Sequence, residues 1–522
     1  MTGPPTLDDR AQQEIDRAIA AANAFAADGR PSDGLDALFP LIDRYPEHPA
    51  LLFAVGRLAQ GAGLLEQAEA AYRGVLRLLP SSVEAATNLA NVMVARDEVA
   101  PALAILQRIH DLAPTVAPVT ASLAAARLAE GDAEEALRLY ERLIDRDPSD
   151  ARHHANRAEA LARLDRHADS LAALDRAATL APDDPDIGFN RSIALLTSGR
   201  VEEGFAAYET RLTPALATAP HREGLTLPRW AGAPLTGPLL VVAEQGLGDE
   251  IRFAAGLTAL REAGVEDIVV EIEPRLVTLL ARGLPWATVR PHDRRTEGGR
   301  RPVFRYRWLD RLPHPPVAWI EAGSLPLRLG AARTRPMAPL GVLAADPGQI
   351  TRVEPLLPPA APGQLRIGLV WSSGVTTHAR RPFYPPLEAF GPLLTARDIV
   401  TVDLQYTDSH TDRARFQELF GAAPAPVEGL DKRGDLDGLA ALMTRLDAVV
   451  AISGSTAALA AALGVPTIEL HRGETWIPRL DDRDYWLGSL RPIAPDSPGD
   501  WPAVMHRCLD TLRRITRHQP PA

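Results

Sequence analysis

The stretch AEQGLGDEIRF follows the apolar run LLVV at residues 239–242 and combines two glycines with two carboxylates. Gly246 and Gly248 permit a tight turn between a strand and a helix, which is a common place for a nucleotide phosphate. Asp249 and Glu250, however, would lie in the first helical turn, where their charges stabilise the positive helix end and repel a phosphate. The stretch therefore favours a general base, Asp249, over a phosphate site. The alternative is that Asp249 only caps the helix.

A second loop, with the residues Ser453, Gly454, Ser455 and Thr456, separates the apolar run DAVVAI from the helical stretch AALAAALG. No carboxylate lies in this loop. Hydroxyl groups and backbone N–H groups at a helix N-terminus bind anions. We therefore expect the loop to hold the phosphates of a ligand, and the alternative is an ordinary Ser/Thr helix cap.

A third loop follows the run RIGLV and contains Trp371, Ser372, Ser373 and Gly374, with Arg380 and Arg381 downstream. An arginine pair beside small polar residues suits the neutralisation of a phosphate leaving group. The alternative is that both arginines are solvated surface charges. In a fourth loop the potential metal ligands have a spacing that fits no compact ligand set, so no metal site is predicted. They are His471, Glu474, Asp481 and Asp484.

These loops need strands and helices to position them. Short β-branched runs alternate with helical stretches in the second half of the chain, and the expected strands are Leu239–Ala243, Asp267–Ile272, Arg366–Val370, Ile399–Leu404, Ala448–Ile452 and Thr467–Leu470. Apolar strands separated by helices indicate parallel sheets that are covered on both faces. A proline-rich region around residues 336–362 divides the series in two, which predicts two Rossmann-like domains. Ligands in such sheets bind beyond the carboxyl ends of the strands.

The first half of the chain repeats every 34 residues, as its prolines show: Pro46, Pro80, Pro114, Pro148 and Pro182. The same register holds turn formers (Gly63, Asp97, Gly131, Asp165, Gly199), small residues (Ala68, Ala102, Ala136, Ser170, Gly204) and large apolar residues (Tyr72, Leu106, Tyr140, Leu174, Tyr208). The turn former breaks the chain between two helices, the small residue permits close helix packing, and the proline ends the second helix. A helix–turn–helix unit with these phases resembles the tetratricopeptide repeat.

Five such units are expected across residues 29–213. Repeats of this kind stack into a superhelix whose concave groove commonly holds a peptide or a protein. A protein partner is therefore expected. The alternative is that the array only dimerises or rigidifies the chain.

The composition narrows the class of protein. The chain of 522 residues is 46% hydrophobic and 24% charged, which is typical of a globular protein with more than one domain. A formal net charge of −11 argues against general nucleic-acid binding. The single cysteine, Cys508, fits a reducing compartment. Neither a secretory signal nor an apolar run long enough to span a membrane is visible, so we expect a cytoplasmic protein.

Three motifs together resemble the GT-B glycosyltransferases: the EQGLGDE loop, the WSSG loop with its downstream RR pair and LQ, and the hydroxyl-rich helix start that runs into ALGVP. Within that group the chain resembles bacterial proteins that join tetratricopeptide repeats to a domain related to heptosyltransferases and O-GlcNAc transferase, some of which glycosylate flagellin. The resemblance covers nearly the whole chain. It implies an α-solenoid followed by an α/β GT-B fold, and metal-independent sugar transfer from a nucleotide-sugar without a further cofactor.

The same resemblance assigns roles to residues of this chain. Asp249 matches the loop aspartate that acts as the base. The acceptor-side loop comprises Gln245, Gly246 and Gly248. The donor-side residues are Trp371, Ser372, Ser373, Gly374, Arg380, Arg381, Gln405, Ser453, Gly454, Ser455 and Thr456. Many relatives carry Asp where Ser453 stands and His where Ala458 stands, and a serine cannot replace a carboxylate as an ionic acceptor of sugar hydroxyls.

Four segments are predicted: a leader with a helix at residues 1–28, a repeat superhelix at 29–213, an acceptor-side Rossmann-like domain at 214–360 and a nucleotide-sugar domain at 361–522. The preferred function is O-glycosylation of Ser or Thr in a protein that the repeats hold, with flagellin as the partner that the resemblance suggests. The alternative is a non-catalytic repeat scaffold whose degenerate transferase domain only binds. Either function is compatible with an oligomer.

Overall fold

The computed structural model describes residues 9–216, 218–244, 246–297, 301–374, 377, 380–473, 475–497 and 499–516. The chain divides into two compact units. The first comprises Met1–Asp183, Thr296–Arg301 and Thr377–Ala379, and the second comprises Asp184–Arg295, Pro302–Thr376 and Arg380–Ala522. The predicted repeat segment, residues 29–213, therefore extends over both units.

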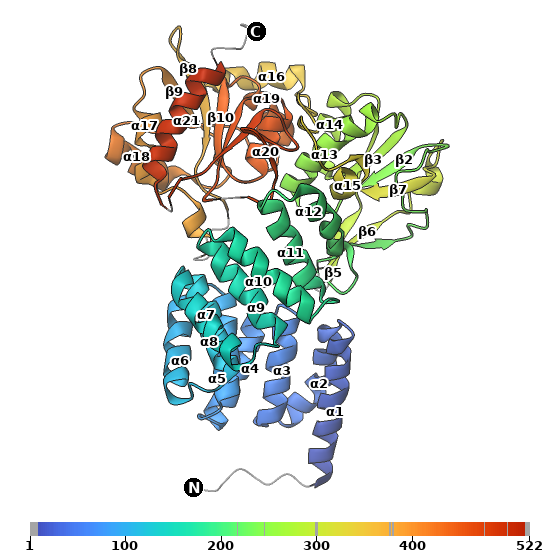
Figure 1. The fold of residues 1–522 in the computed structure, drawn as a ribbon, viewed down its shortest axis with the longest axis vertical. Coiled ribbons are helices and arrows are strands. Elements are labelled where there is room, and N and C mark those ends of the chain that lie inside the picture. The colour runs from blue at the N-terminus through green and yellow to red at the C-terminus, as the bar shows by residue number, and fades with distance from the viewer. Residues whose placement is uncertain are drawn as a thin grey trace. The chain divides into compact units, whose positions relative to one another are not determined.

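The first unit is a series of helical hairpins (Figure 1). Its helices are α1 (Asp9–Ala27), α2 (Pro31–Arg44), α3 (Pro49–Gly61), α4 (Leu65–Leu78), α5 (Val83–Ala95), α6 (Val99–Leu112), α7 (Ala117–Glu130), α8 (Ala133–Arg146), α9 (Ala151–Arg163) and α10 (His167–Leu180). Each helix packs against the next one in the chain. Nearest-neighbour packing of this kind makes the unit a helical solenoid.

The predicted repeat pattern is confirmed residue by residue. The five turn formers Gly63, Asp97, Gly131, Asp165 and Gly199 all adopt positive φ, between 57° and 104°, which reverses the chain between helices. The small residues Ala68, Ala102, Ala136 and Ser170 are buried, as are Tyr72, Leu106, Tyr140, Leu174 and Tyr208. The period in the sequence therefore reflects one packing unit repeated along the chain.

The second unit begins with one more helical hairpin and continues into a first α/β half. The hairpin comprises α11 (Pro185–Thr197), α12 (Val201–Tyr208) and the 3-10 turn η1 (Glu209–Leu212). The first half comprises β1 (His221–Glu223), β2 (Leu239–Val242), α13 (Leu247–Glu262), β3 (Ile268–Ile272), η2 (Pro274–Leu276), α14 (Val277–Gly283), β4 (Thr288–Pro291), β5 (Arg294–Glu297), β6 (Arg301–Arg305), η3 (Leu309–Arg311), β7 (Ala318–Glu321), η4 (Ala322–Ser324) and α15 (Leu325–Leu329). The last two residues of β5 and the first residue of β6 belong to the stretch that groups with the first unit.

The main sheet of this half has the strand order β4-β3-β2-β7, and all of its neighbouring strands are parallel. The chain runs from β2 to β3 and β4 on one side and then returns to β7 on the other. The switch point, where ligands bind in such sheets, therefore lies at the carboxyl ends of β2 and β7. The glycine–carboxylate loop begins at this point.

The second α/β half follows the proline-rich region. It comprises α16 (Pro347–Val353), η5 (Glu354–Leu356), β8 (Leu365–Val370), η6 (Arg381–Phe383), η7 (Leu387–Phe390), α17 (Gly391–Leu394), β9 (Ile399–Asp403), α18 (His410–Phe420), α19 (Leu436–Met443), β10 (Ala448–Ile452), α20 (Ser455–Ala462), β11 (Thr467–Leu470), β12 (Arg479–Leu480), β13 (Arg483–Asp484), β14 (Leu490–Ile493) and α21 (Trp501–Thr516). Its parallel sheet has the order β14-β11-β10-β8-β9. The switch point lies between β8 and β10, from which the WSSG loop and the hydroxyl-rich loop emerge.

All six predicted strands are present, with ends that differ by one residue at most. The strands β4, β7 and β14 complete the two parallel sheets and were not predicted. Each has only four residues, and β4 and β14 are partly exposed along most of their length. A short strand without a continuous apolar run gives little signal in a sequence.

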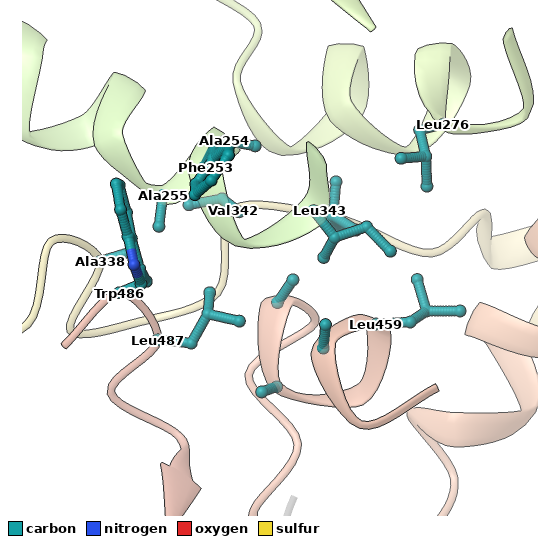
Figure 2. Close-up of a cluster of buried hydrophobic side chains, with 14 of the residues drawn as sticks. Phe253, Ala254, Ala255, Leu276, Ala338, Val342, Leu343, Leu459, Trp486 and Leu487 are labelled. Carbon is teal, nitrogen blue, oxygen red and sulfur yellow. The ribbon is translucent and has the colours of Figure 1, made fainter. Parts of the chain in front are cut away.

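The two α/β halves share one hydrophobic core (Figure 2). Phe253 of α13 lies against Trp486 of the second half, with ring centroids 5.0 Å apart. Leu459 of α20 belongs to the same cluster, and Ala458 beside it is fully buried. The facing loops of the two halves are therefore held in place by a continuous apolar contact between α13 and α20.

None of the helices in the described part of the chain combines the length and the apolar character that a membrane-spanning helix needs. The cysteine Cys508 is buried in α21. Burial raises the pKa of its thiol to about 12, which keeps the group protonated and unreactive.

Candidate functional site

The first turns of α13 and α20 lie against each other. A Cβ added at Gly248 would lie 3.4 Å from both the backbone nitrogen and the Cα of Ser455. An added Cβ would therefore be in van der Waals contact with the start of α20, which shows how closely the two helix starts approach. The structure thus brings together the predicted loop with Gly246 and Gly248 and the predicted loop with Ser453, Gly454, Ser455 and Thr456, while Gln245 lies outside the described residues.

Asp249 lies in the first turn of α13 and is half-buried. The N-cap of this helix is Gly246, and the Asp249 carboxylate accepts a hydrogen bond from the Gly246 backbone N–H. Asp249 is therefore not the N-cap that the alternative proposed. It is the third residue of the helix, and its side chain bonds back to the N–H of the N-cap, as in a capping box. Burial raises the pKa of Asp249 to about 6, and the Glu244 and Glu250 charges add to that effect while Arg252 opposes it. A carboxylate with such a pKa and partial solvent access can accept a proton near neutral pH.

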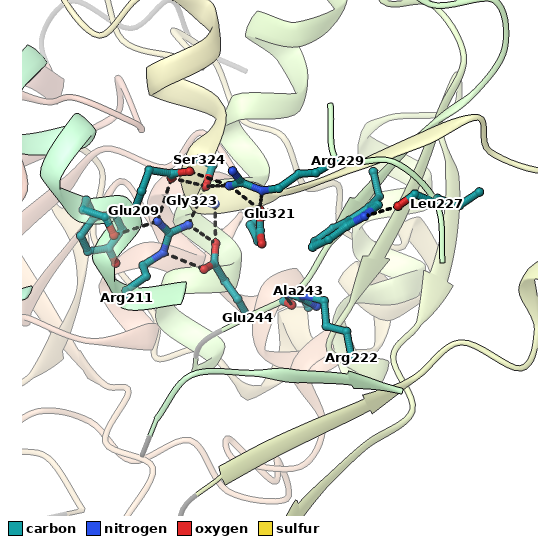
Figure 3. Close-up of polar contacts among 12 residues, drawn as sticks. Glu209, Arg211, Arg222, Leu227, Arg229, Ala243, Glu244, Glu321, Gly323 and Ser324 are labelled. Atoms are coloured by element: carbon teal, nitrogen blue, oxygen red, sulfur yellow. Dashed lines mark hydrogen bonds and ion pairs between the residues drawn. The ribbon is translucent and has the colours of Figure 1, made fainter. Parts of the chain in front are cut away.

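Glu244, at the start of the same loop, is held by a bidentate ion pair (Figure 3). Its two carboxylate oxygens accept hydrogen bonds from Arg211, at 2.8 Å from Nε and 3.0 Å from Nη2. A third bond comes from the backbone N–H of Gly323, at 2.7 Å, just beyond β7. Both side chains of the pair are almost fully buried. The loop is thereby anchored across the switch point.

Glu250 faces away from the pair and into a second buried polar cluster. Its Oε2 accepts the backbone N–H of Glu273 at 2.6 Å, and its Oε1 lies 3.5 Å from Nε2 of His292. Burial raises the pKa of Glu271 to about 7 in this cluster, and Tyr306 donates its hydroxyl to Glu271 at 3.0 Å. The surrounding carboxylates keep the pKa of His292 above its ordinary value although burial alone would lower it.

Arg252, one turn further along α13, joins the two halves through buried charges. It donates to Glu469 at the end of β11, at 2.5 Å, and to Asp484 in β13. Burial alone would raise the pKa of Glu469, yet Arg252 and His471 lower it below its ordinary value. The pKa of Asp484 stays raised because burial outweighs the effect of Arg252. A buried cation thus fixes the first turns of α13 against the second sheet.

The hydroxyl-rich loop has no side-chain cap. Gly454 is the N-cap of α20 and provides no side-chain cap. Its own backbone N–H donates to Oε1 of Glu469 at 3.4 Å. Ser453 is exposed, Ser455 is half-buried and Thr456 is buried. The Ser/Thr cap considered as the alternative is therefore absent from this helix, and the backbone N–H groups that follow Gly454 in its first turn remain available to an anion.

The WSSG loop is organised by Gln405, which is buried after β9. Gln405 Nε2 donates to the carbonyl of Ser372 at 2.7 Å and to its hydroxyl at 2.9 Å. Trp371 is buried in the core, with its indole N–H on Asp412, and the Gly374 N–H donates to the Tyr406 hydroxyl at 2.9 Å. Trp371 and Gln405 therefore shape this loop from beneath, whereas Ser373 and Gly374 lie nearer its surface. Arg380 and Arg381 are exposed.

A pocket of about 190 Å³ opens beside the start of α20. It is lined by Leu247, Ile251, Arg275, Tyr406, Lys432, Arg433, Leu436, Leu439, Ser455, Thr456 and Leu459. The lining comes from both α/β halves, and it combines an aliphatic floor with three cationic side chains. Ser455 and Thr456 are the predicted residues that the pocket contains.

Three cations of the pocket were not predicted. Arg275 belongs to the first half, and its Nη1 donates to the carbonyl of Arg433 in the second half at 3.0 Å. Lys432 Nζ donates to the carbonyl of Asp403 at 2.8 Å, and burial lowers its pKa. The guanidinium of Arg433 makes no hydrogen bond or ion pair with another residue in the described part of the chain. The composition contained one signal that could have drawn attention to Lys432: it is the only lysine among the 56 lysine and arginine residues of the chain.

Metal ligands do not gather anywhere in the described ranges: no three His, Cys, Asp or Glu side chains there form a group that could hold an ion. Of the residues considered as ligands in the sequence, His471 pairs with Glu469 at 2.9 Å and Asp484 with Arg252. Glu474 lies outside the described residues.

Comparison with known proteins bears on the helical repeats. The family model described as tetratricopeptide repeat matches residues 19–83 and 122–185. The chain contains tetratricopeptide repeats. Among solved structures, a tetratricopeptide repeat protein of Thermus thermophilus is 19% identical and covers 35% of this chain and 99% of its own, with a TM-score of 0.33. One of Parabacteroides merdae is 15% identical and covers 39% of this chain and 81% of its own, with a TM-score of 0.32.

A curated protein matches a larger part of the chain. Protein FlbA of Caulobacter vibrioides is 34% identical over 328 residues, which are 61% of this chain and 53% of that protein. The chain thus spans about half the length of the curated relative that it matches. The match is longer than the repeats alone, so it includes part of the chain outside the segments that the repeat family covers.

Proposed function

We propose that this protein is a glycosyltransferase of the GT-B type, which transfers a sugar from a nucleotide-sugar to a hydroxyl group of a protein. One observation carries the proposal: the cationic pocket at the open N-terminus of α20 adjoins, across the contact of Gly248 with Ser455, the turn that carries Asp249. Cationic side chains and free backbone donors suit a diphosphate. A carboxylate whose pKa lies near 6 suits the removal of a proton from an acceptor.

The reaction balances with these groups alone. The acceptor hydroxyl gives its proton to the carboxylate of Asp249, and its oxygen forms a bond to the anomeric carbon of the sugar. The bond from that carbon to the phosphate oxygen breaks, and the nucleoside diphosphate leaves with the electron pair. Lys432, Arg433 and the first N–H groups of α20 would stabilise the charge that develops on it.

The tetratricopeptide repeats support a protein as the acceptor. Such repeats bind peptides and proteins along their superhelix, and the helices α1 to α10 make up most of the first unit of this chain. Flagellin is the acceptor that the family resemblance suggests. In this proposal the repeats bind the acceptor protein, and Asp249 with the adjoining pocket carries out the transfer.

A second candidate is a repeat scaffold that binds a phosphate-bearing ligand without transfer. The pocket of about 190 Å³ is smaller than the ~300–1,000 Å³ of typical ligand sites. Ala458, where relatives carry a histidine near the donor, is fully buried in the core and offers no group to a ligand. Both observations favour binding of the phosphates alone.

The test is the mass of an acceptor protein incubated with the purified chain and a panel of nucleotide-sugars. Wild type is expected to add the mass of one sugar residue or more. Asp249→Asn keeps the size of the side chain but not the base, so the transfer rate should fall by ~10²-fold or more. Arg415→Met, which removes an exposed ion pair on α18, serves as the matched control and should transfer at the wild-type rate. Nucleotide binding without any mass gain would leave the scaffold as the function.

A further inference from the structure

Arg211 lies outside every loop predicted to take part in chemistry, yet it is among the most constrained side chains of the second unit. It stands in η1, directly after α12, and is almost fully buried. All five N–H donors of its guanidinium are used (Figure 3). Besides the two bonds to Glu244, Nη1 donates to the carbonyl of Tyr208 at 3.1 Å and to Glu209 at 3.2 Å, and Nη2 donates to Ser324 at 2.9 Å.

The helical hairpin that presents Arg211 is part of the core of the second unit. The guanidinium lies 4.3 Å from the ring centroid of Tyr208, whose ring stacks on Trp476 at 5.6 Å. Phe205 of α12 packs edge-on against Trp486 at 6.1 Å. The hairpin therefore holds Arg211 rigidly, and Arg211 transmits that position to the loop after β2.

Glu244, the partner of Arg211, is also tightly enclosed. It precedes the N-cap Gly246 by two residues, and a Cβ added at Gly323 would lie only 2.6 Å from its Oε1. The charge of Glu244 also acts on Asp249, together with the charges of Glu250 and Arg252. Arg211 thus controls both the place of the loop and part of the electric field at Asp249.

We propose that Arg211 is a positioning residue for sugar transfer, which holds Glu244 so that Asp249 meets the acceptor hydroxyl in a reactive geometry. The inference rests on the proposed function. The site would then include more than the two α/β halves, because the helical hairpin of α11, α12 and η1 would help to position the base. A lysine cannot replace this arginine, since a single ammonium group cannot form the planar fork to Glu244 and also reach Ser324 and Tyr208.

The first test needs no substrate. Hydrogen exchange of the backbone amides from residue 243 to residue 250 should become at least ~10-fold faster in Arg211→Lys and in Arg211→Met. The matched control is Arg200→Met, which removes an exposed arginine paired with Glu203 on α12 and should leave this exchange unchanged. Tryptophan fluorescence verifies that the variants are folded, because all eight tryptophans lie in the second unit.

The second test separates positioning from a general structural role. In Arg211→Met, kcat should fall by about 10- to 100-fold, the expected cost of a displaced catalytic group, while KM for the nucleotide-sugar changes by less than about 3-fold. The midpoint of the acidic limb of the pH–rate profile should rise, because the unpaired Glu244 charge disfavours ionisation of Asp249. Arg211→Met combined with Glu244→Gln should bring that midpoint back without restoring kcat.

Unchanged exchange in Arg211→Lys, or equal losses of kcat and of nucleotide affinity in Arg211→Met, would overturn the positioning role. If wild type transfers no sugar, the proposed function fails, and the exchange experiment then decides whether Arg211 positions the loop. The two failures are therefore distinguishable.

Discussion

The buried arginine that joins the two α/β halves offers a prediction whose size follows from its surroundings. Arg252 is 4% exposed and stands between two buried carboxylates, Glu469 at 1% and Asp484 at 2%. Replacing it by methionine keeps most of the side-chain volume but leaves Asp484 buried without its cation and Glu469 with His471 as its remaining ion-pair partner. Removing one partner of a buried ion pair costs about 3–5 kcal/mol. We expect Arg252→Met to lower the free energy of unfolding of the second unit by that amount at pH 8.

The loss should depend on pH in a defined direction. Without Arg252, burial raises the native pKa of Asp484 further above its unfolded value near ~4, and the native pKa of Glu469 also rises because it loses the larger of the two charges that lower it. The native state then binds protons more readily than the unfolded state, so stability falls as pH rises through the raised native pKa values. The difference between Arg252→Met and wild type should therefore be smaller at pH 5 than at pH 8.

Urea unfolding followed by tryptophan fluorescence measures this difference for the second unit alone, because the first unit has no tryptophan. Arg415→Met is the matched control, and its exposed partners predict a change within about 0.5 kcal/mol. A loss of less than about 1 kcal/mol in Arg252→Met, or a loss that grows from pH 8 to pH 5, would refute the reasoning about buried charge.

Three further outcomes are expected. Glu271→Gln should abolish a decline in stability of about 3 kcal/mol between pH 4.5 and 7, because burial raises the native pKa of Glu271 to about 7 and the native state therefore keeps a proton that the unfolded state loses in that range. Urea unfolding at a series of pH values measures this decline, and an unchanged slope would contradict the prediction. Gly248→Val should cost ~1–3 kcal/mol by forcing α13 away from Ser455, and pyrophosphate binding measured by calorimetry should weaken with it. The transfer rate should fall about 10-fold from pH 7 to pH 5, as the Asp249 carboxylate with a pKa of about 6 becomes protonated; a flat rate over this range would exclude Asp249 as the base.

Much of the fold was predictable because its signals are local. The column of positive-φ turn formers, from Gly63 to Gly199, marks the same turn in every repeat, and the structure confirms it. The β-branched runs that begin at Leu239 and Ala448 are buried on both faces, so their apolar sequences predicted them. Placement of the loops at the carboxyl ends of these strands followed from the topology of parallel sheets.

The site was predictable only in part because its contacts are distant in sequence. Arg211 meets Glu244 across 33 residues, and Arg252 meets Asp484 across 232. Lys432 does not directly follow a strand, and its side chain is positioned at the pocket by its hydrogen bond to the carbonyl of Asp403. The N-cap residues of the two helices were also not predictable from the sequence, because they are Gly246 and Gly454 and not the neighbouring polar residues. Pairings of this kind arise from tertiary packing.

The central claim is that the pocket at the start of α20 binds the diphosphate of a sugar donor. The single lysine of the chain makes a direct measurement available, because acylation of amines can modify only Lys432 and the terminal amine of the protein used. Mass spectrometry then gives the rate of acylation at each site, with and without UDP, GDP, ADP or pyrophosphate. The account predicts that at least one of these protects Lys432 while the terminal amine reacts at an unchanged rate, and that Arg433→Met weakens the protection. Acylation of Lys432 at the same rate with and without every one of them would contradict it.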